Sequence, residues 1–376
     1  MPGKIDRAAI EAFQRDFEAL RDRMATVIVG YREVIEDLLL CFFAGGNVLI
    51  DSAPGLGKTL IAKTLAHVMD LRSTRIQFTP DLMPADIIGT TIVQETTDGK
   101  KHFVFQKGPV FTQLLLADEI NRATPKTQSA LLEAMQERHV SAAGTTWELD
   151  RPYFVIATMN SHETGGTYAL PEAQVDRFFF KLTLSKPDID HLQEISRRHS
   201  LAGGHLGVPP SSFAVPGGHA GPPLQQKVID ARRAEEMKAL VLAVGAPHAL
   251  RRFAIEIVLR TNPASTQCAE RARLHLRYGS SPRGVQALIL GAKVRALVAG
   301  RDTAQEGDVL AVARPALAHR LLVNFEGEAE GLRTEDLIDE VVADMTSAAR
   351  PVAQPPSAGN AHPRAGVPQP VPQEKA

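Results

Sequence analysis

The sequence contains few of the residues that build disulfide frameworks, cysteine-rich metal sites or stacking surfaces. Among 376 residues there are two cysteines, Cys41 and Cys268, and aromatic residues make up 5%. Two cysteines so far apart exclude a disulfide framework or a cysteine-rich zinc site, and they fit a reducing cytosol. Cys41 lies in an apolar, helix-like run and is expected in the core. The scarcity of aromatics disfavours a stacking platform for single-stranded nucleic acid.

An excess of either charge is also missing. The chain has 42 Lys and Arg against 43 Asp and Glu, which gives a formal net charge of −1. This balance argues against a protein that mainly coats nucleic acid or an anionic membrane, although a local basic patch remains possible.

A long apolar run is missing as well. The most apolar stretch, residues 38–50, has about 13 residues interrupted by Gly45-Gly46-Asn47, and is therefore too short to span a bilayer. The charged N-terminal residues are not followed by the apolar segment of a signal peptide. We therefore expect a soluble, cytoplasmic protein without a membrane span.

Proline and glycine, by contrast, are abundant and unevenly distributed. Of 25 prolines, five lie in residues 201–223 and seven in the last 26 residues, which hold no Leu, Ile or Phe. The first segment also holds six glycines, and it predicts a flexible linker or loop over residues 191–226. The second cannot bury enough apolar area to offset the entropy of ordering, so a disordered tail is predicted over residues 349–376.

The rest of the chain divides into three parts with different patterns. Residues 1–26 predict an amphipathic helix, because apolar side chains recur every three or four positions: Ile10, Phe13, Phe17, Leu20 and Met24. In residues 27–190, short apolar strands alternate with helical segments, which predicts an α/β domain with a doubly wound parallel sheet. The predicted strands cover residues 47–50, 75–79, 114–118, 153–159 and 178–184. Residues 227–348 predict a small all-helical domain.

Two hairpins are predicted as insertions in the α/β domain. One covers residues near 90–107 and turns at Asp98-Gly99, and the other covers residues near 140–150 and turns around Gly144. Neither belongs to the alternating strand and helix pattern of the sheet.

Three helix starts are predicted in the helical domain. Ser281 suits an N-cap and Pro282 the first helical position. Residues 303–306 predict a capping box that opens a second helix, and a third is expected to begin near Thr334.

The strongest chemical signal is a glycine-rich turn between a predicted strand and a predicted helix. Gly55 and Gly57 let backbone N–H groups approach phosphate oxygens, and the helix N-terminus adds a positive partial charge. Lys58 would reach the β- and γ-phosphates of a nucleotide, and the Thr59 hydroxyl would bind Mg²⁺. Ser52 replaces the first glycine of the usual P-loop, which is acceptable where φ is negative. The predicted nucleotide-binding residues are Ala53, Pro54, Gly55, Leu56, Gly57, Lys58, Thr59 and Leu60.

Polar residues end two further strands of the α/β domain. Asp118 and Glu119 follow one apolar strand and Asn160 follows another, and ligands of open α/β sheets bind at the carboxyl ends of the strands. Asp118 would hold Mg²⁺ directly or through water, and Glu119 would orient and polarise the attacking water. Asn160 could hold that water, although a residue that merely ends a strand explains it equally well.

Two arginines lie near predicted element boundaries. Arg177 precedes a strand, and Arg283 lies in the first turn of a helix, where the helix N-terminus also favours an anion. For each of them alone, a solvated or salt-bridged side chain is the commoner role.

Together these residues resemble the MoxR family of AAA+ ATPases. The similarity runs from about Val27 to Asn324, and three motifs carry it: residues 78–89, 118–128 and 165–178. The resemblance implies a P-loop core followed by a helical lid, in an ATP-driven homo-oligomeric ring that is often hexameric and has its sites between subunits. It also implies individual roles: sensor 1 for Asn160, an arginine finger in trans for Arg177, sensor 2 for Arg283, and part of the adenine pocket for Val29 and Gly30.

The same resemblance implies a biological role. Family members are chaperone-like proteins that mature or remodel protein complexes, often with a partner that carries a von Willebrand factor A domain. The two hairpins match family insertions that often face the ring pore or a partner. We therefore expect Mg²⁺-dependent ATP hydrolysis that acts on a protein substrate.

Three alternatives remain open at this point. They are a DNA-dependent motor, the motor subunit of a metal chelatase, and a nucleotide-gated scaffold with little turnover. The near-zero net charge and the few aromatics weigh against DNA. A metal site is not expected, because the spacings between His191, His199, His205 and His219 lack the i,i+4 pattern of a helical zinc site, and we expect these residues on the surface or in the linker.

Overall fold

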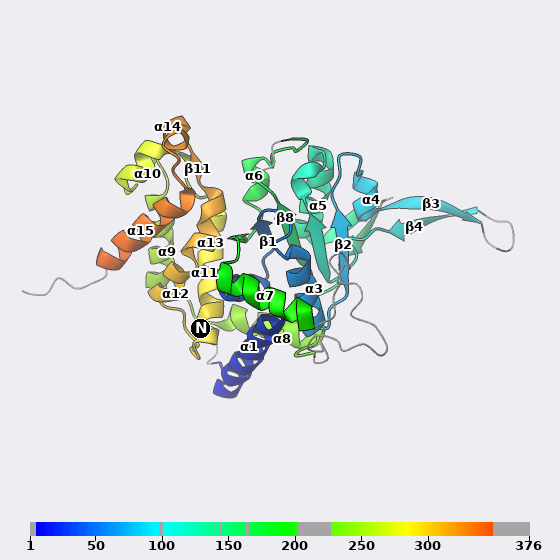
Figure 1. The fold of residues 1–376 in the computed structure, drawn as a ribbon, viewed down its shortest axis with the longest axis horizontal. Coiled ribbons are helices and arrows are strands. Elements are labelled where there is room, and N and C mark those ends of the chain that lie inside the picture. Colours follow the sequence, from blue (N-terminus) through cyan, green and yellow to red (C-terminus); the bar gives the residue numbers. More distant parts are fainter. Residues whose placement is uncertain are drawn as a thin grey trace, which may run out of the picture.

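The computed structural model of the chain describes residues 5–95, 97, 101–142, 144–161, 165–201 and 227–348. An α/β domain is built around one sheet and is followed by a helical lid, which lies beside it in Figure 1. No helix within these ranges is long and apolar enough to cross a membrane.

Five parallel strands form the central sheet in the order β2-β5-β8-β1-β9. Their bounds are β1 Val48–Asp51, β2 Ser73–Gln77, β5 Leu114–Asp118, β8 Phe154–Met159 and β9 Phe180–Thr183. The five predicted strands are thus confirmed, with shifted ends. The ladder to β5 pairs Ser73 with Leu114 and Gln77 with Asp118, so β2 lies two residues earlier than predicted.

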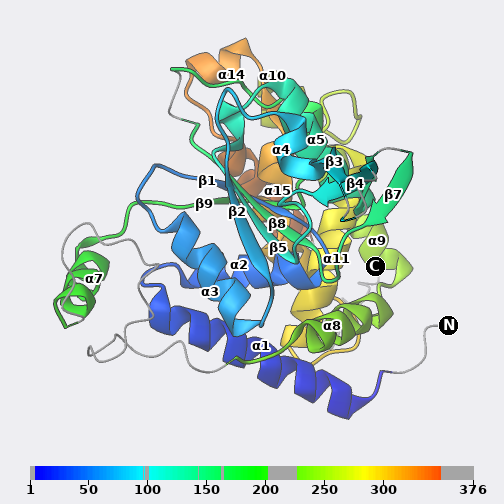
Figure 2. The same cartoon turned by 90° about the vertical axis from the view of Figure 1, so that its right-hand side faces the viewer.

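The central strands β1, β5 and β8 are mainly apolar and buried because helices cover both faces of the sheet (Figure 2). Along β5, Leu114 and Leu116 join one core cluster, whereas Leu115 and Ala117 join the other. The first cluster includes α1 Arg7–Val27, α2 Arg32–Phe43, α3 Lys58–Val68 and residues of the lid, and the second includes α4 Pro84–Ile88 and α5 Pro125–Glu137. The lid therefore shares one continuous core with one face of the sheet.

The predicted N-terminal helix is confirmed as α1. Its buried residues are the five that set the predicted apolar face: Ile10, Phe13, Phe17, Leu20 and Met24. Phe13 and Phe17 pack on Phe43 of α2, so this helix is an integral layer of the α/β domain.

Both predicted hairpins are confirmed. β3 Gly89–Glu95 pairs with β4 Lys101–Lys107, and β6 His139–Ala142 pairs with β7 Thr145–Glu148. The β3–β4 hairpin extends away from the rest of the molecule in Figure 1. Its predicted turn at Asp98-Gly99 lies outside the described residues.

The predicted linker over residues 191–226 is wrong for its first part, which is helical. α7 Ile189–Leu201 contains no proline or glycine, and the Asp188 side chain accepts a hydrogen bond from the backbone N–H of His191 at 2.8 Å. This contact satisfies a free amide at the helix N-terminus. Residues 202–226 and the predicted tail over 349–376 lie outside the described residues.

The lid is helical apart from the short ribbon formed by β10 Leu276–Tyr278 and β11 Leu322–Val323. Its helices are α8 Ala231–Ala243, α9 His248–Arg260, α10 Glu270–His275, α11 Pro282–Val298, α12 Glu306–Ala311, α13 Ala313–Leu317, η3 Ala318–Arg320, α14 Phe325–Ala329 and α15 Thr334–Ala348. The predicted start of α11, with Ser281 as N-cap and Pro282 in the first position, is confirmed. So is the start of α15 at Thr334.

The capping box predicted at residues 303–306 is wrong. α12 begins at Glu306, its N-cap is Gln305, and the box is closed by Asp308, which accepts a hydrogen bond from the N–H of Gln305 at 2.8 Å. Thr303 is instead engaged in a bridge to Gly245, which keeps its backbone outside the helix.

Candidate nucleotide site

The glycine-rich turn forms an open loop between the end of β1 and the start of α3. We call residues 52–59 the phosphate cradle. Gly55 and Gly57 have φ of 84° and 85°, in the left-handed region that favours glycine. A Cβ atom built on either glycine would have no other atom within 4 Å, so space remains open over this backbone. A bound phosphate group fits such a loop, because backbone N–H groups at the start of a helix can point at it.

Lys58 lies buried within the cradle. Its ammonium group donates a hydrogen bond to the carbonyl of Ser52 at 3.3 Å, which folds the side chain back over the loop. Ser52 does not have a positive φ, so the replacement of the usual glycine introduces no backbone strain here. Ala53, Leu56, Thr59 and Leu60 are half-buried and Pro54 is exposed.

Asp118 is buried at the carboxyl end of β5 and is held from two sides. The Thr158 hydroxyl donates to its Oδ1 at 2.6 Å, and the Arg75 guanidinium donates to its Oδ2 at 2.7 Å. A carboxylate offers about four acceptor positions, so Asp118 can still accept a hydrogen bond from a metal-bound water. Together with the Thr59 hydroxyl, this donor set suits Mg²⁺, which prefers oxygen ligands and retains several waters.

Glu119 adopts a left-handed backbone conformation directly after β5, with φ of 58°. Its N–H donates to the Thr158 hydroxyl at 2.9 Å. Its carboxylate accepts from Gln77 at 2.9 Å and pairs with Arg122 at 3.0 Å. The strained backbone thus turns the carboxylate off the strand axis, and two neighbouring side chains orient it.

Asn160 lies between the acids and the phosphate cradle. It follows β8, which is the strand between β5 and β1 in the sheet. Asn160 is buried, and its backbone carbonyl accepts a hydrogen bond from the side-chain amide of Asn121 at 3.3 Å. The sheet order therefore brings together, at one edge, three features that lie far apart in the sequence.

Asp51 is a polar residue of this edge that sequence reasoning missed. It ends β1 and accepts hydrogen bonds from the Ser161 hydroxyl at 2.5 Å and from Lys181 at 2.9 Å. Burial raises the pKa of Asp51, but Lys181 and Ser161 oppose it more strongly, so the pKa lies below its ordinary value. Asp51 follows three apolar residues at the end of its strand, the same signal that singled out Asp118.

Arg75 and Gln77 were also missed. They alternate along β2 with the buried Ile76, so both lie on the same side of that strand. Arg75 also donates to the side chain of Gln77 at 2.8 Å, which links the partners of Asp118 and Glu119 to each other. The alternation of polar residues was visible in the sequence, but the strand order that places them beside the acids was not.

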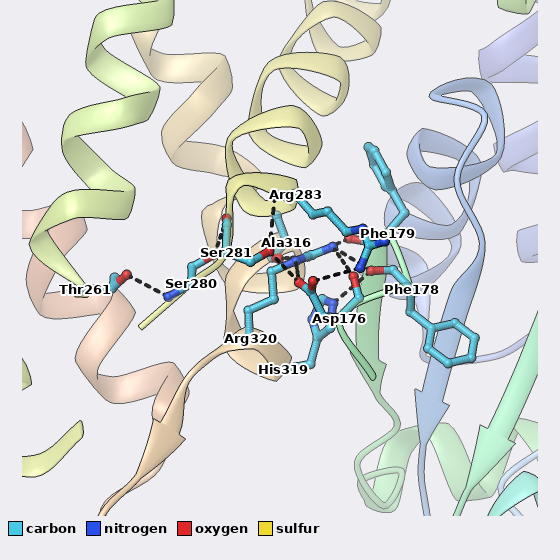
Figure 3. Close-up of polar contacts among 10 residues, drawn as sticks. All are labelled: Asp176, Phe178, Phe179, Thr261, Ser280, Ser281, Arg283, Ala316, His319 and Arg320. Atoms are coloured by element: carbon cyan, nitrogen blue, oxygen red, sulfur yellow. Dashed lines mark hydrogen bonds and ion pairs between the residues drawn. The ribbon is translucent and has the colours of Figure 1, made fainter. Parts of the chain in front are cut away.

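Arg283 contacts Asp176, the residue directly before Arg177. The Arg283 guanidinium donates to Oδ2 of Asp176 at 3.1 Å, whereas Arg177 is exposed and its side chain has no recorded hydrogen bond or ion pair to the part of the chain that the structure describes. Ser281 also donates to Oδ1 of Asp176, at 2.8 Å (Figure 3). The predicted sensor 2 is therefore bonded to Asp176, the residue directly before the predicted finger.

Gly30, in the segment predicted to line the adenine pocket, lies against His191 of α7 but remains exposed. It has φ of 84°, and a Cβ built on it would come within 2.8 Å of the His191 ring. His191 is itself paired with Asp188 at 2.7 Å. Val29 beside Gly30 is half-buried.

The structure describes no side chain of the other histidines noted in the sequence. His205 and His219 lie outside the described ranges, and the side chain of His199 is not described. No group of three or more metal-ligating side chains occurs among the residues described.

Family models match both domains of the chain. The model for the ATPase family associated with various cellular activities (AAA) matches residues 47–180, and that for the AAA lid domain matches residues 268–341. A crystal structure from Cytophaga hutchinsonii, of a protein assigned provisionally as an ATPase, superposes with a TM-score of 0.77 and 37% identity. The match covers 89% of this chain and 96% of the other.

Curated relatives extend the similarity over most of the sequence. Chaperone MoxR1 of Mycobacterium tuberculosis is 36% identical, with a match that covers 84% of this chain and 78% of its own. Protein MoxR of Paracoccus denitrificans is 31% identical, over 88% and 95% of the two chains. The chain therefore belongs to the MoxR family of AAA+ ATPases, with an α/β P-loop core and a helical lid.

Proposed function

We propose that this protein hydrolyses ATP in a Mg²⁺-dependent reaction, assembled as a homo-oligomeric and most simply hexameric ring, and uses the cycle to remodel or mature a protein complex. The observation that carries the proposal is the sheet order β5-β8-β1. It sets Asp118 and Glu119, then Asn160, then the phosphate cradle side by side at one edge. Phosphoryl transfer needs mainly positioning and charge neutralisation, and these residues supply both.

Each residue of the edge has a role in this proposal. Lys58 and the cradle backbone bind the phosphates, and Thr59 and Asp118 hold the metal ion. Bound with ATP, Mg²⁺ would neutralise charge on the phosphate oxygens. Glu119 orients and polarises the attacking water, and Asn160 positions it. Val29 and Gly30 border the base.

Two arginines complete the site between subunits. Arg177 is exposed, which suits a finger that acts on the nucleotide of a neighbouring subunit. Arg283 lies in the first turn of α11 and would contact a nucleotide phosphate as sensor 2. An isolated subunit should therefore hydrolyse ATP slowly.

A protein substrate is favoured over DNA. The β3–β4 hairpin exposes Val93 and Phe103, at 56% and 82% of their surfaces, and exposed apolar groups of this kind suit a protein surface. The chain has no excess of positive charge for DNA. By analogy with the family, the partner could carry a von Willebrand factor A domain.

The function is tested with Glu119→Gln, which keeps the size of the side chain but removes its charge. We expect ATP binding to persist while steady-state phosphate release falls by about 10²-fold or more. Glu133→Gln, an exposed position on α5, is the matched control and should hydrolyse normally. Undiminished turnover of Glu119→Gln would remove Glu119 from its role.

The biological role is tested separately. Capture of bound proteins by Glu119→Gln in the presence of ATP, read by mass spectrometry, should identify a protein complex. Stimulation of ATP hydrolysis by DNA would instead support the DNA motor, and absence of hydrolysis by the assembled ring would support the scaffold.

A further inference from the structure

Arg320 of the lid is buried against the backbone around Arg177. Its side chain is 2% exposed, and it reaches from η3 to the segment that leads into β9. One amino group, Nη2, donates to the carbonyl of Asp176 at 3.2 Å and to the carbonyl of Phe178 at 2.7 Å. These carbonyls belong to the residues directly before and after Arg177. A single guanidinium from the lid thus holds the backbone on both sides of the predicted finger (Figure 3).

His319 strengthens the same attachment. Burial and the neighbouring Arg320 lower the pKa of His319 well below its ordinary value, so its ring is neutral. Its Nε2 lies 3.0 Å from the carbonyl of Phe178, which can only accept, so this nitrogen carries the hydrogen. Phe178 itself is fully buried in the core of the α/β domain. The backbone at Phe178 is therefore fixed from both domains.

Asp176 provides the negative charge that makes this burial tolerable. Its Oδ1 accepts from Nε of Arg320 at 3.0 Å and from the Ser281 hydroxyl at 2.8 Å. Its Oδ2 accepts from Arg283 at 3.1 Å. A buried guanidinium is stable only when it is paired and hydrogen-bonded. We call Asp176, Ser281, Arg283 and Arg320 the lid junction.

The two arginines of the lid junction differ in their freedom to move. The side chain of Arg283 is 43% exposed and makes one hydrogen bond to Asp176, whereas that of Arg320 is enclosed and also donates to the carbonyls of Phe179 and Ala316. An anion that attracts Arg283 would therefore break its hydrogen bond to Asp176 at small cost. Asp176 would then still accept hydrogen bonds from Arg320 and Ser281.

We propose that Asp176 and Arg320 are positioning residues that couple the lid of one subunit to the arginine finger of the same subunit. Arg320 joins η3 of the lid to the backbone on both sides of Arg177, and Asp176 holds Arg320 in place through its carboxylate. The packing of the lid thus sets the position of the finger that is presented to the neighbouring subunit. This coupling rests on the proposed function, which supplies the ring, the finger and the sensor.

The experiment separates the finger donor from the hydrolysing subunit. The donor carries Glu119→Gln, so its own site is inactive but its finger is intact. The acceptor carries Arg177→Ala, so its site is intact but it offers no finger. Mixed rings of full-length chains should hydrolyse ATP at acceptor sites that face a donor. The test adds Arg320→Lys to the donor, because lysine retains the charge next to Asp176 but cannot bridge two carbonyls as a planar fork does.

We expect Arg320→Lys in the donor to lower kcat of the mixed rings about tenfold, since small misplacement of a catalytic group is costly, with KM unchanged. Arg314→Lys in the donor, at an exposed lid ion pair with Asp339, is the control and should change neither. Ring assembly by mass photometry and ATP affinity of the donor must remain as in the parent. A purely structural role for Arg320 would lower stability or assembly and leave the rate per assembled ring unchanged, which would overturn the coupling.

If Arg320→Lys does not fold, Ser281→Gly in the donor provides a milder test. Glycine is well tolerated as an N-cap, and the substitution removes only the hydroxyl bound to Asp176. A smaller fall in kcat of the mixed rings is expected, and an unchanged rate would count against the coupling. Absence of any hydrolysis in mixed rings of the unmodified donor and acceptor would overturn the proposed function itself, which distinguishes the two failures.

Discussion

The phosphate cradle and the lid junction are two polar regions built in opposite ways. The cradle uses eight consecutive residues, 52–59, and presents backbone groups to open space around Gly55 and Gly57. The lid junction joins Asp176 to side chains that lie 105 to 144 residues further along the chain, and its central arginine is enclosed. The cradle is thus ready for a ligand, whereas the junction is already satisfied by protein groups.

This difference predicts separate consequences for mutation. A change in the cradle should weaken ligand binding and leave folding nearly intact, because few tertiary contacts depend on the loop. A change in the lid junction should alter stability, catalysis in the ring, or both. Four variants, two within these regions and two at residues next to them, test that division from the largest expected effect to the smallest.

Arg177→Ala should give the largest effect. Arginine fingers contribute about 10³–10⁵ to turnover, so kcat of the assembled ring should fall by at least about 10³-fold while ATP affinity stays unchanged. Phosphate release and nucleotide titration measure the two quantities on the same preparation. Full turnover in an assembled ring would mean that Arg177 is not the finger.

Arg320→Met should give the largest loss of stability. Removal of one partner of a buried ion pair costs about 3–5 kcal/mol, and here it also removes the guanidinium hydrogen bonds to the carbonyls of Phe178 and Phe179. Arg314→Met breaks a half-exposed ion pair and should cost less than about 1 kcal/mol. Urea unfolding followed by circular dichroism compares the two variants. Equal unfolding midpoints would contradict the prediction that the buried ion pair contributes more to stability than the half-exposed one.

Lys58→Ala should affect ligand binding more than folding. Loss of a hydrogen bond to a charged group costs about 1.5–3 kcal/mol, so the Kd for ATP should rise by about 10- to 100-fold. The matched control is Lys63→Ala, at an exposed position of the same helix. Calorimetric titration with ATP measures the change, and an unchanged Kd would exclude Lys58 from the phosphate site.

Asp51→Asn should give the smallest effect, and one that depends on pH. Because the folded-state pKa of Asp51 lies below its ordinary value, its ionised form stabilises the fold above the unfolded pKa, and this contribution disappears as the pH falls through the folded pKa. At pH 7 the variant should be less stable by about 1 kcal/mol, the net contribution of a hydrogen bond. The difference in unfolding free energy should shrink in acid, and a difference that grows would reverse the assignment.

The accuracy of the sequence predictions depended on how local each feature is. The five strands, both hairpins and the start of α11 at Ser281 were predicted correctly, because alternation, turn residues and caps act within a few positions. The two errors arose where nearby residues or a tertiary contact outweighed the local sequence pattern. Proline and glycine in residues 201–223 suggested a linker that extended back into α7, and a bridge to Gly245 kept Thr303 from capping a helix.

The same distinction explains the candidate site. Lys58, Asp118 and Glu119 are recognisable because each follows an apolar strand in a pattern with few other causes. Arg75, Gln77 and Arg320 were missed, since an arginine or glutamine in a strand or helix is usually solvated. Only the pairing of β2 with β5, and the packing of η3 against β9, brings them to the acids and to the predicted finger.

The sequence by itself determined the family, the strand and helix pattern, and the local geometry of the phosphate cradle, because glycine conformation and helix start are set by adjacent residues. The tertiary structure alone decided that Asp176 joins the two domains and that Arg320 encloses the backbone beside Arg177. Those contacts depend on how the lid packs against the sheet. A buried charge pairs with a residue that is close in space but distant in the sequence, so no local sequence pattern reveals the partner.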